Sequence, residues 1–137
     1  MKKILFSLLL IIIFVACDDC EFTIDSYEVL TGMDIPKTTR VDCEYDSERK
    51  IKITVFELEM ANFNIEEYAA KYDFQLVATD YEVDFEGMDL LFGDDTEFPP
   101  NKQLYIRKGR NKKNGKNYQY LLDIETGKMW GEIVQKP

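Results

Sequence analysis

The chain has 137 residues, a length that fits one small domain. Its 26 acidic and 17 basic residues give a formal net charge of -9, and an acidic balance repels nucleic acid, so we expect no nucleic-acid partner. The sequence contains no histidine, which excludes Ser-His and Cys-His nucleophile pairs and histidine-bound zinc. It also lacks a glycine-rich phosphate loop. We therefore predict a protein that is not an enzyme and that holds no cofactor or metal.

The N-terminal residues have the three-part pattern of an export signal. The basic start Met1 to Lys3 is followed by an apolar run from Ile4 to Ala16 that is interrupted only by Ser7 and ends at Cys17. A membrane-spanning helix needs about 20 apolar residues, so this run is too short to cross a bilayer. We predict that residues 1–16 are a secretory signal that is removed from the mature protein.

The segment Phe14 to Cys17 resembles the lipobox of bacterial lipoproteins, in which small residues precede a cysteine that receives a lipid. Phe14 departs from that pattern, because leucine is usual there. The resemblance covers residues 1–17 and implies a diacylglycerol thioether on Cys17, usually with a further acyl chain on its amine. Two or more chains anchor a protein stably. The implied location is the cell envelope, on the inner or outer membrane and either periplasmic or surface-exposed. Asp18 and Asp19 are compatible with inner-membrane retention and with export to the cell surface.

Cys20 and Cys43 are the cysteines that remain once Cys17 carries lipid. Disulfides form in oxidising compartments such as the envelope, and a bridge here would contribute about 3 kcal/mol by restricting the unfolded chain. Sequence alone fixes no distance between two cysteines. The alternatives are therefore a disulfide between Cys20 and Cys43 and a pair of separate thiols.

Residues 17–24 are expected to form the lipidated N-terminus and a tether, and residues 25–137 a single domain. Within it, residues 25–30 predict a brief helix that Thr31-Gly32 ends. Alternating apolar residues at 41–46, a polar turn at 47–49 and an apolar run at 51–60 predict a β-hairpin.

The second strand of this hairpin changes its apolar face part-way along. Three of its apolar residues share one face, whereas three others fall on the opposite face: Ile51, Ile53 and Val55, followed by Phe56, Leu58 and Met60. The change indicates either a β-bulge or burial of both faces of the sheet.

Residues 64–72 form the main predicted helix. Asn64 is a suitable N-cap, Glu66 and Glu67 lie in the first turn, and apolar residues recur at helical spacing. Residues 74–78 are consistent with a short strand. Residues 80–97 combine eight acidic residues with interleaved apolar ones, and no period assigns them a structure.

Three further strands are predicted at 103–108, 117–124 and 128–134, because Asn114-Gly115 and Thr126-Gly127 supply the positive φ angles of tight turns. The predicted fold is α+β: an antiparallel sheet of about five strands that ends in a meander, with one main helix on one face. The segment Leu122 to Lys128 resembles the Asp-x-x-Thr-Gly hairpin of PepSY-type and many other small envelope domains. That resemblance implies a turn and no particular function.

Charge is distributed unevenly along the chain. Residues 17–101 contain 23 acidic and 6 basic residues, whereas residues 102–137 contain 9 basic and 3 acidic ones. We predict that the acidic part binds a basic protein partner, with solubility as the alternative explanation. The candidate binding face consists of Asp84, Glu86, Asp94, Asp95 and Glu97.

A run of basic residues is predicted at a hairpin tip. It is a candidate contact for anionic lipid headgroups or cell-surface polymer, or else an exposed tip whose charges prevent edge aggregation. Its members are Arg107, Lys108, Arg110, Lys112, Lys113 and Lys116.

Two functional hypotheses follow. The first is a non-enzymatic envelope module, accessory or inhibitory, that binds a protein partner. The second is an envelope domain that binds a ligand or calcium, the latter through acidic residues between 86 and 97, or, as the weaker form, a hydrolase built on two carboxylates. A flat acidic face would support the first hypothesis and a deep aromatic pocket the second.

Overall fold

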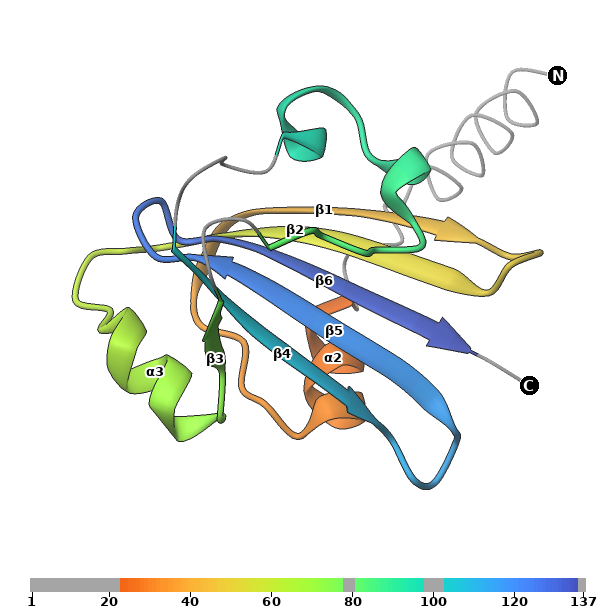
Figure 1. Cartoon of the computed structure of the whole chain (residues 1–137), viewed down its shortest axis with the longest axis horizontal. Helices are drawn as coiled ribbons and strands as arrows, with labels where there is room; N and C mark the ends of the chain where they lie inside the picture. Colours follow the sequence, from red (N-terminus) through yellow and green to blue (C-terminus); the bar gives the residue numbers. More distant parts are fainter. Residues whose placement is uncertain (1–22, 78–80, 98–102, 136–137) are drawn as a thin grey trace, which may run out of the picture.

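The computed structural model describes residues 23–77, 81–97 and 103–135. These residues form a six-stranded antiparallel sheet in the order β1-β2-β6-β5-β4-β3, with helices on one face and a long loop on the other (Figure 1). The predicted α+β class is confirmed. The predicted count of about five strands is too low, because the short segment after the predicted main helix pairs as a sixth, edge strand. The prediction of one main helix is also wrong, because the helix of Thr23–Thr31 is longer than the predicted one and packs in the same hydrophobic cluster.

The elements follow one another with short connections, apart from the loop between β3 and β4. The two helices are α2 (Thr23–Thr31) and α3 (Ile65–Lys71), and the loop contains two 3-10 turns, η2 (Met88–Leu90) and η3 (Gly93–Thr96). The strands are β1 (Thr38–Asp46), β2 (Ile51–Leu58), β3 (Gln75–Val77), β4 (Leu104–Arg110), β5 (Lys116–Asp123) and β6 (Lys128–Gln135).

Local signals in the sequence set most element ends. The Asn64 side chain accepts a hydrogen bond from the backbone N–H of Glu67 at 3.1 Å, which caps α3 as predicted. Gly32, Gly115 and Gly127 have φ angles of 71°, 72° and 73°, a region that glycine enters without a steric penalty. The predicted helix end and both predicted turns are therefore confirmed.

Asp123 organises the last hairpin. Its carboxylate accepts hydrogen bonds from the backbone N–H of Glu125 at 3.0 Å and from the Thr126 hydroxyl at 2.9 Å, while its carbonyl accepts from Gly127 N–H at 3.0 Å. The side chain thereby satisfies turn donors that the strands cannot reach. The Asp-x-x-Thr-Gly segment is turn chemistry, as its resemblance implied.

Both faces of the sheet are buried, which explains the change of face in β2. Ile53 and Val55 pack with Phe85 and Leu91 of the loop, whereas Phe56 and Leu58 belong to the cluster on the helical face. The pairing of β2 with β6 runs without a shift from Ile51↔Val134 to Glu57↔Lys128. Burial of both faces is therefore the right alternative, and no bulge interrupts β2; a shift occurs instead in β1, between Thr38 and Arg40.

Helix α2 packs on the centre of the sheet through one buried ring. Tyr27 is 0% exposed, and its hydroxyl donates to the carbonyl of Gly131 in β6 at 2.8 Å. A Cβ on Gly131 would lie 2.8 Å from the Tyr27 ring and 3.2 Å from the rings of Phe56 and Tyr120. The missing side chain is therefore what lets α2 approach the strand so closely.

Candidate functional site

The loop of residues 81–97 lies against the sheet and carries most of the predicted acidic face. The side chains of Phe85 and Leu91 are buried between the loop and the sheet. The indole N–H of Trp130 donates to the carbonyl of Asp95 at 2.9 Å. The Asp95 carboxylate is itself nearly buried, with ion pairs to Arg40 at 3.1 Å and Lys128 at 2.9 Å. This end of the loop is therefore fixed by a buried aromatic ring and a paired charge.

Two further ion pairs fix the rest of the loop. Arg49 contacts both oxygens of Asp89, at 3.1 and 2.7 Å, and also pairs with Asp46 at 2.6 Å. The hydrogen bonds from Arg49 lower the pKa of both carboxyls below the usual aspartate range. Lys108 of β4 pairs with Asp84 at 3.0 Å. Acidic residues of the loop thus meet basic residues of the strands and the β1–β2 turn.

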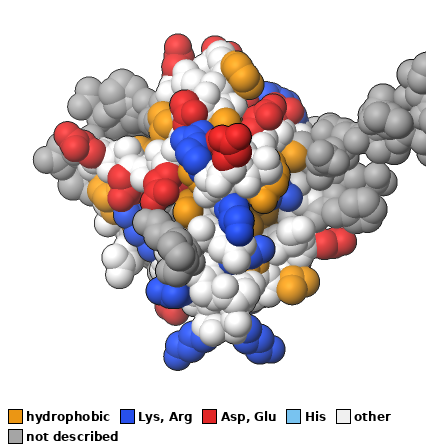
Figure 2. All heavy atoms as spheres, turned by 90° about the vertical axis from the view of Figure 1, so that its right-hand side faces the viewer, with side chains coloured by type: hydrophobic (Ala, Val, Ile, Leu, Met, Phe, Trp, Pro, Cys, Tyr) orange, Lys and Arg blue, Asp and Glu red, His pale blue; other side chains and the backbone are white. Residues whose placement is uncertain are grey.

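The structure gathers the five predicted acidic residues in this one loop but gives them different environments. The carboxylates of Asp84 and Asp95 form ion pairs within the chain, and the carbonyl of Asp94 accepts a hydrogen bond from Lys128 at 3.2 Å. The side chains of Glu86 and Glu97 are exposed, and Glu86 lines a hollow described below. In Figure 2 acidic side chains are mixed with basic ones over the upper part of the surface. The loop is therefore not a uniformly negative face.

Phe92 is the prominent apolar feature of the loop surface. Its side chain is 73% exposed, although Leu91 beside it is 9% exposed. Gly93, with a φ of 57°, turns the chain directly after it, and the Phe92 carbonyl accepts from Asp95 N–H at 3.2 Å. Phe92 also borders a hollow of about 310 Å³ that reaches Arg40 and Glu44. A large exposed ring is thus held on a fixed backbone.

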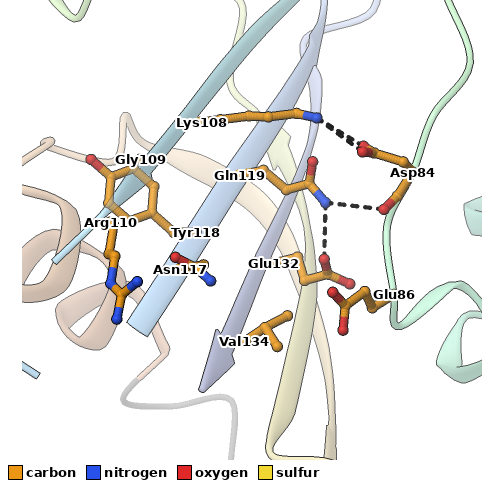
Figure 3. Close-up of a pocket in the computed structure, with 10 residues that line it drawn as sticks. All are labelled: Asp84, Glu86, Lys108, Gly109, Arg110, Asn117, Tyr118, Gln119, Glu132 and Val134. Carbon is orange, nitrogen blue, oxygen red and sulfur yellow. Dashed lines mark hydrogen bonds and ion pairs between the residues drawn. The ribbon is translucent and has the colours of Figure 1, made fainter. Parts of the chain in front are cut away.

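A second hollow, of about 470 Å³, lies between this loop and strands β4, β5 and β6 (Figure 3). Its walls carry charges of both signs, with Lys108 and Arg110 on one side and Asp84 and Glu86 on the other. The remaining lining residues include Asn117, Tyr118, Gln119, Glu132 and Val134. The hollow is polar and open, and it differs from the deep aromatic pocket that would favour the ligand-binding hypothesis.

Glu132, in this hollow, is the most buried acid of the site, at 2% exposure. Its carboxylate accepts hydrogen bonds from Gly87 N–H at 2.6 Å and from the Gln119 amide at 2.9 Å. A Cβ on Gly87 would lie 2.9 Å from the Ile51 side chain and 3.2 Å from the Glu132 carboxylate. Gly87 therefore lets the loop backbone reach Glu132. Burial raises the pKa of the Glu132 carboxyl above 4.5, and the hydrogen bonds that the carboxylate accepts oppose that shift.

This raised pKa should make the protein lose stability as the pH rises above the ordinary glutamate pKa. Between pH 4.5 and the raised pKa of Glu132, the folded state binds more protons than the unfolded state. The contribution of Glu132 to the free energy of unfolding is therefore fully present below pH 4.5 and is lost as the pH rises through the pKa of the folded state. Urea unfolding at several pH values should show this slope, and Glu132→Gln should remove it. Glu66→Gln, on the exposed side of α3, is the control. Parallel curves for the wild type and Glu132→Gln would contradict the assignment.

Sequence reasoning did not single out Glu132 or Trp130. A signal was present: Trp130, Glu132 and Val134 alternate along a predicted strand, so they share one face. A glutamate between two apolar residues on a buried face predicts a carboxylate with hydrogen-bond partners. Recognising Glu132 from this pattern would require knowing that residues 81–97 cover this face of the sheet.

The structure divides the predicted basic residues into two groups. Arg107 donates to the carbonyl of Tyr72 at 2.6 Å, and Lys108 pairs with Asp84, so both act within the fold. The others surround the β4–β5 hairpin and border a separate groove against α2: Arg110, Lys112, Lys113 and Lys116.

The predicted lipid site and the predicted disulfide lie partly beyond the described residues. Cys17 and Cys20 are outside them. Cys43, in β1, is disulfide-bonded, and residues 23–77, 81–97 and 103–135 contain no other cysteine. Pairing with Cys20 in particular remains a prediction.

In the part of the chain that the structure describes, no group of three or more acidic or cysteine side chains is arranged to hold a metal ion. Asp89 and Asp95, two of the acids considered for calcium, face Arg49, Arg40 and Lys128 instead. Over the same residues, no helix combines the length and apolar character needed to span a bilayer.

Comparisons of the chain with protein-family models, with curated proteins and with solved structures give no match.

Proposed function

We propose that the chain is a lipid-anchored protein of the bacterial cell envelope whose domain is a non-enzymatic module that binds a protein partner through the surface of residues 81–97. The anchor is supported by the signal pattern of residues 1–16 and by Cys17 directly after it. Helix α2 begins at Thr23, so little chain separates the anchor from the domain.

The observation that carries the binding surface is the 73% exposure of Phe92. Aromatic side chains with polar surroundings are enriched at the energetic centres of protein interfaces, where they are buried on binding. Phe92 has Asp89, Asp94 and Asp95 as near neighbours in sequence. The ion pairs to Arg49, Arg40 and Lys128 hold its loop in place, so few degrees of freedom are lost on binding.

The acidic residues near Phe92 favour a basic partner. Ion pairs within the chain reduce the local negative charge, but residues 17–101 keep a large acidic excess over basic residues. Such an excess accelerates association with a positively charged surface and does so less at high salt, as the screening length shortens from about 30 Å at 0.01 M to about 8 Å at 0.15 M. The partner class is therefore a basic envelope protein.

The anchor is tested by expressing the full chain in bacteria supplied with labelled fatty acid. Wild-type protein should incorporate the label and lose residues 1–16, whereas Cys17→Ser should do neither. Cys43→Ser is the matched control and should still be lipidated. Labelled and normally cleaved Cys17→Ser protein would refute the anchor.

The binding surface is tested by crosslinking the full chain in intact envelopes and identifying a reproducible partner. Phe92→Ala should reduce its capture tenfold or more, because loss of an interfacial hot spot costs about 2 kcal/mol. Leu76→Ala removes another exposed apolar side chain, on the edge strand β3, and should leave capture unchanged. Unchanged capture by Phe92→Ala would refute this surface.

The second candidate function is binding of a small polar ligand. The hollow is not the deep aromatic pocket expected for this function, but the burial of Glu132 at its wall favours a polar ligand there. Native mass spectrometry of the full chain isolated from envelopes tests this candidate, because a bound small molecule adds its mass. If Glu132→Gln removes such a molecule and Phe92→Ala leaves partner capture unchanged, the hollow is the functional site.

A further inference from the structure

We infer that the groove between α2 and the β4–β5 hairpin is the surface with which the domain rests on an anionic membrane. This inference rests on the proposed lipid anchor at Cys17. The groove has a volume of about 960 Å³, with Asp25, Val29 and Leu30 of α2 on one wall and the hairpin on the other. We call it the basic groove, after its hairpin residues Arg110, Lys112, Lys113 and Lys116.

The charge of the basic groove matches anionic headgroups. Its four basic residues face a single acidic lining residue, Asp25. The side chains of Arg110, Lys112 and Lys113 are exposed. Figure 1 places the β4–β5 hairpin at the lower end of the molecule, and Figure 2, turned about the same vertical axis, shows basic side chains projecting there. Each basic residue near an anionic surface strengthens binding about fivefold.

The hairpin presents these charges on an ordered backbone. The Asn111 amide donates to the carbonyl of Leu30 in α2 at 2.9 Å, so the hairpin is tied to the other wall of the groove. The Asn111 side-chain oxygen also accepts from the backbone N–H of Lys113 at 2.9 Å and of Asn114 at 3.3 Å. Hairpin and helix therefore form one surface that can meet a membrane together.

Val29 adds an apolar contact on the same surface. It is 84% exposed, while Tyr27 on the opposite side of α2 is buried against the sheet. An apolar side chain next to lysines is the arrangement found at membrane interfaces, where the apolar group enters the headgroup boundary and the cations remain in it. Val29 and Lys112 belong to the lining of one groove, so a flat membrane can meet both.

The position of α2 in the sequence places this surface close to the anchor. Six residue steps separate Cys17 from Thr23, and a fully extended chain covers roughly 20 Å over that distance. The nine residues of α2 add about 13 Å at 1.5 Å per residue. A lipid on Cys17 therefore confines the basic groove to the vicinity of the bilayer, where headgroup binding is effectively intramolecular.

The test measures lysine reactivity in the mature lipidated full chain. The protein is purified from bacterial membranes and reconstituted into vesicles of phosphatidylcholine alone or of phosphatidylcholine and phosphatidylglycerol in equal parts. Acylation of individual lysines is followed by mass spectrometry. Lys112 and Lys113 should react several-fold more slowly in the anionic vesicles, and high salt should restore their rates. Lys71, on α3, is the internal control and should react equally in both.

Equal reactivity of Lys112 and Lys113 in the two vesicle types would overturn the inference. Protection that occurs in native envelopes but not in pure anionic vesicles would also overturn it, because the groove would then bind another envelope macromolecule. Lys116 lines the same groove and should also react more slowly in anionic vesicles. The variant Lys112→Glu/Lys113→Glu should abolish this slower reaction of Lys116, whereas Lys71→Glu should preserve it. The intact mass of the same samples reports whether Cys17 carries lipid, so failure of the anchor and failure of the groove are read separately.

Discussion

Replacing Trp130 with alanine should lower the free energy of unfolding by about 3 to 5 kcal/mol, the range for removing a large aromatic side chain from a core. Trp130 is 1% exposed on the central strand β6, under the loop of residues 81–97. Its indole N–H donates to the carbonyl of Asp95, and Lys128 lies 5.2 Å from its ring centroid. The truncation therefore removes packing, a buried hydrogen bond and part of the attachment of the loop.

Urea unfolding followed by far-UV circular dichroism measures this effect, because Trp130 is the only tryptophan and its fluorescence disappears with it. Trp130→Phe is the matched control. It keeps an aromatic ring but loses the donor to Asp95, and it should cost about 1 to 3 kcal/mol. A loss below 1 kcal/mol for Trp130→Ala would show that the loop does not depend on this contact.

Removing the disulfide of Cys43 should lower the free energy of unfolding by about 3 kcal/mol, because a crosslink restricts the unfolded chain. Cys43 is disulfide-bonded, and the proposed anchor uses Cys17 for lipid, so we expect Cys20 to be the partner. Cys20→Ser and Cys43→Ser should then lose the same stability. The double variant should lose no more than either single one.

The disulfide prediction is checked by urea unfolding with and without reductant. Reductant should destabilise the wild type and leave Cys43→Ser unchanged. If Cys17→Ser, and not Cys20→Ser, reproduces the loss in Cys43→Ser, then Cys17 is the partner and lipidation at that residue is excluded.

The elements that the sequence predicts correctly are those with local signals. Asn64 caps α3 through a side chain three residues from its donor, and Gly115 and Gly127 need positive φ angles whatever surrounds them. The Asp123 carboxylate accepts hydrogen bonds from donors two and three residues further along the same turn. Such contacts are encoded within a few residues, so a short stretch of sequence contains all the information.

The elements that the sequence leaves open depend on distant contacts. Residues 81–97 show no period because their structure comes from Trp130, Arg49 and Lys108, which belong to other parts of the chain. The change of face in β2 has the same origin, since a pattern alone cannot tell a bulge from a loop that covers the second face. The short strand β3 exists because β4 is beside it.

In the candidate site, too, the sequence predicts the local features and leaves open those that depend on distant contacts. Sequence composition identified the acidic stretch, and the structure brings Asp84, Glu86, Asp94, Asp95 and Glu97 into one loop. Composition did not reveal that Asp84 and Asp95 of the loop pair with Lys108 of β4 and Lys128 of β6. Nor did composition identify the exposure of Phe92, because an apolar residue next to Leu91 gives no sign of which one is buried.

The contact between α2 and β6 has a mechanical consequence under the proposed N-terminal anchor. A pull on that anchor would enter the domain at two points: the disulfide expected between Cys20 and Cys43, which lies in the edge strand β1, and α2, where Tyr27 contacts Gly131 in the middle of the sheet. Strand β6 is hydrogen-bonded on both sides, to β2 and to β5. The contact with β6 would therefore take part of the load, and the edge strand β1 would not have to resist it alone.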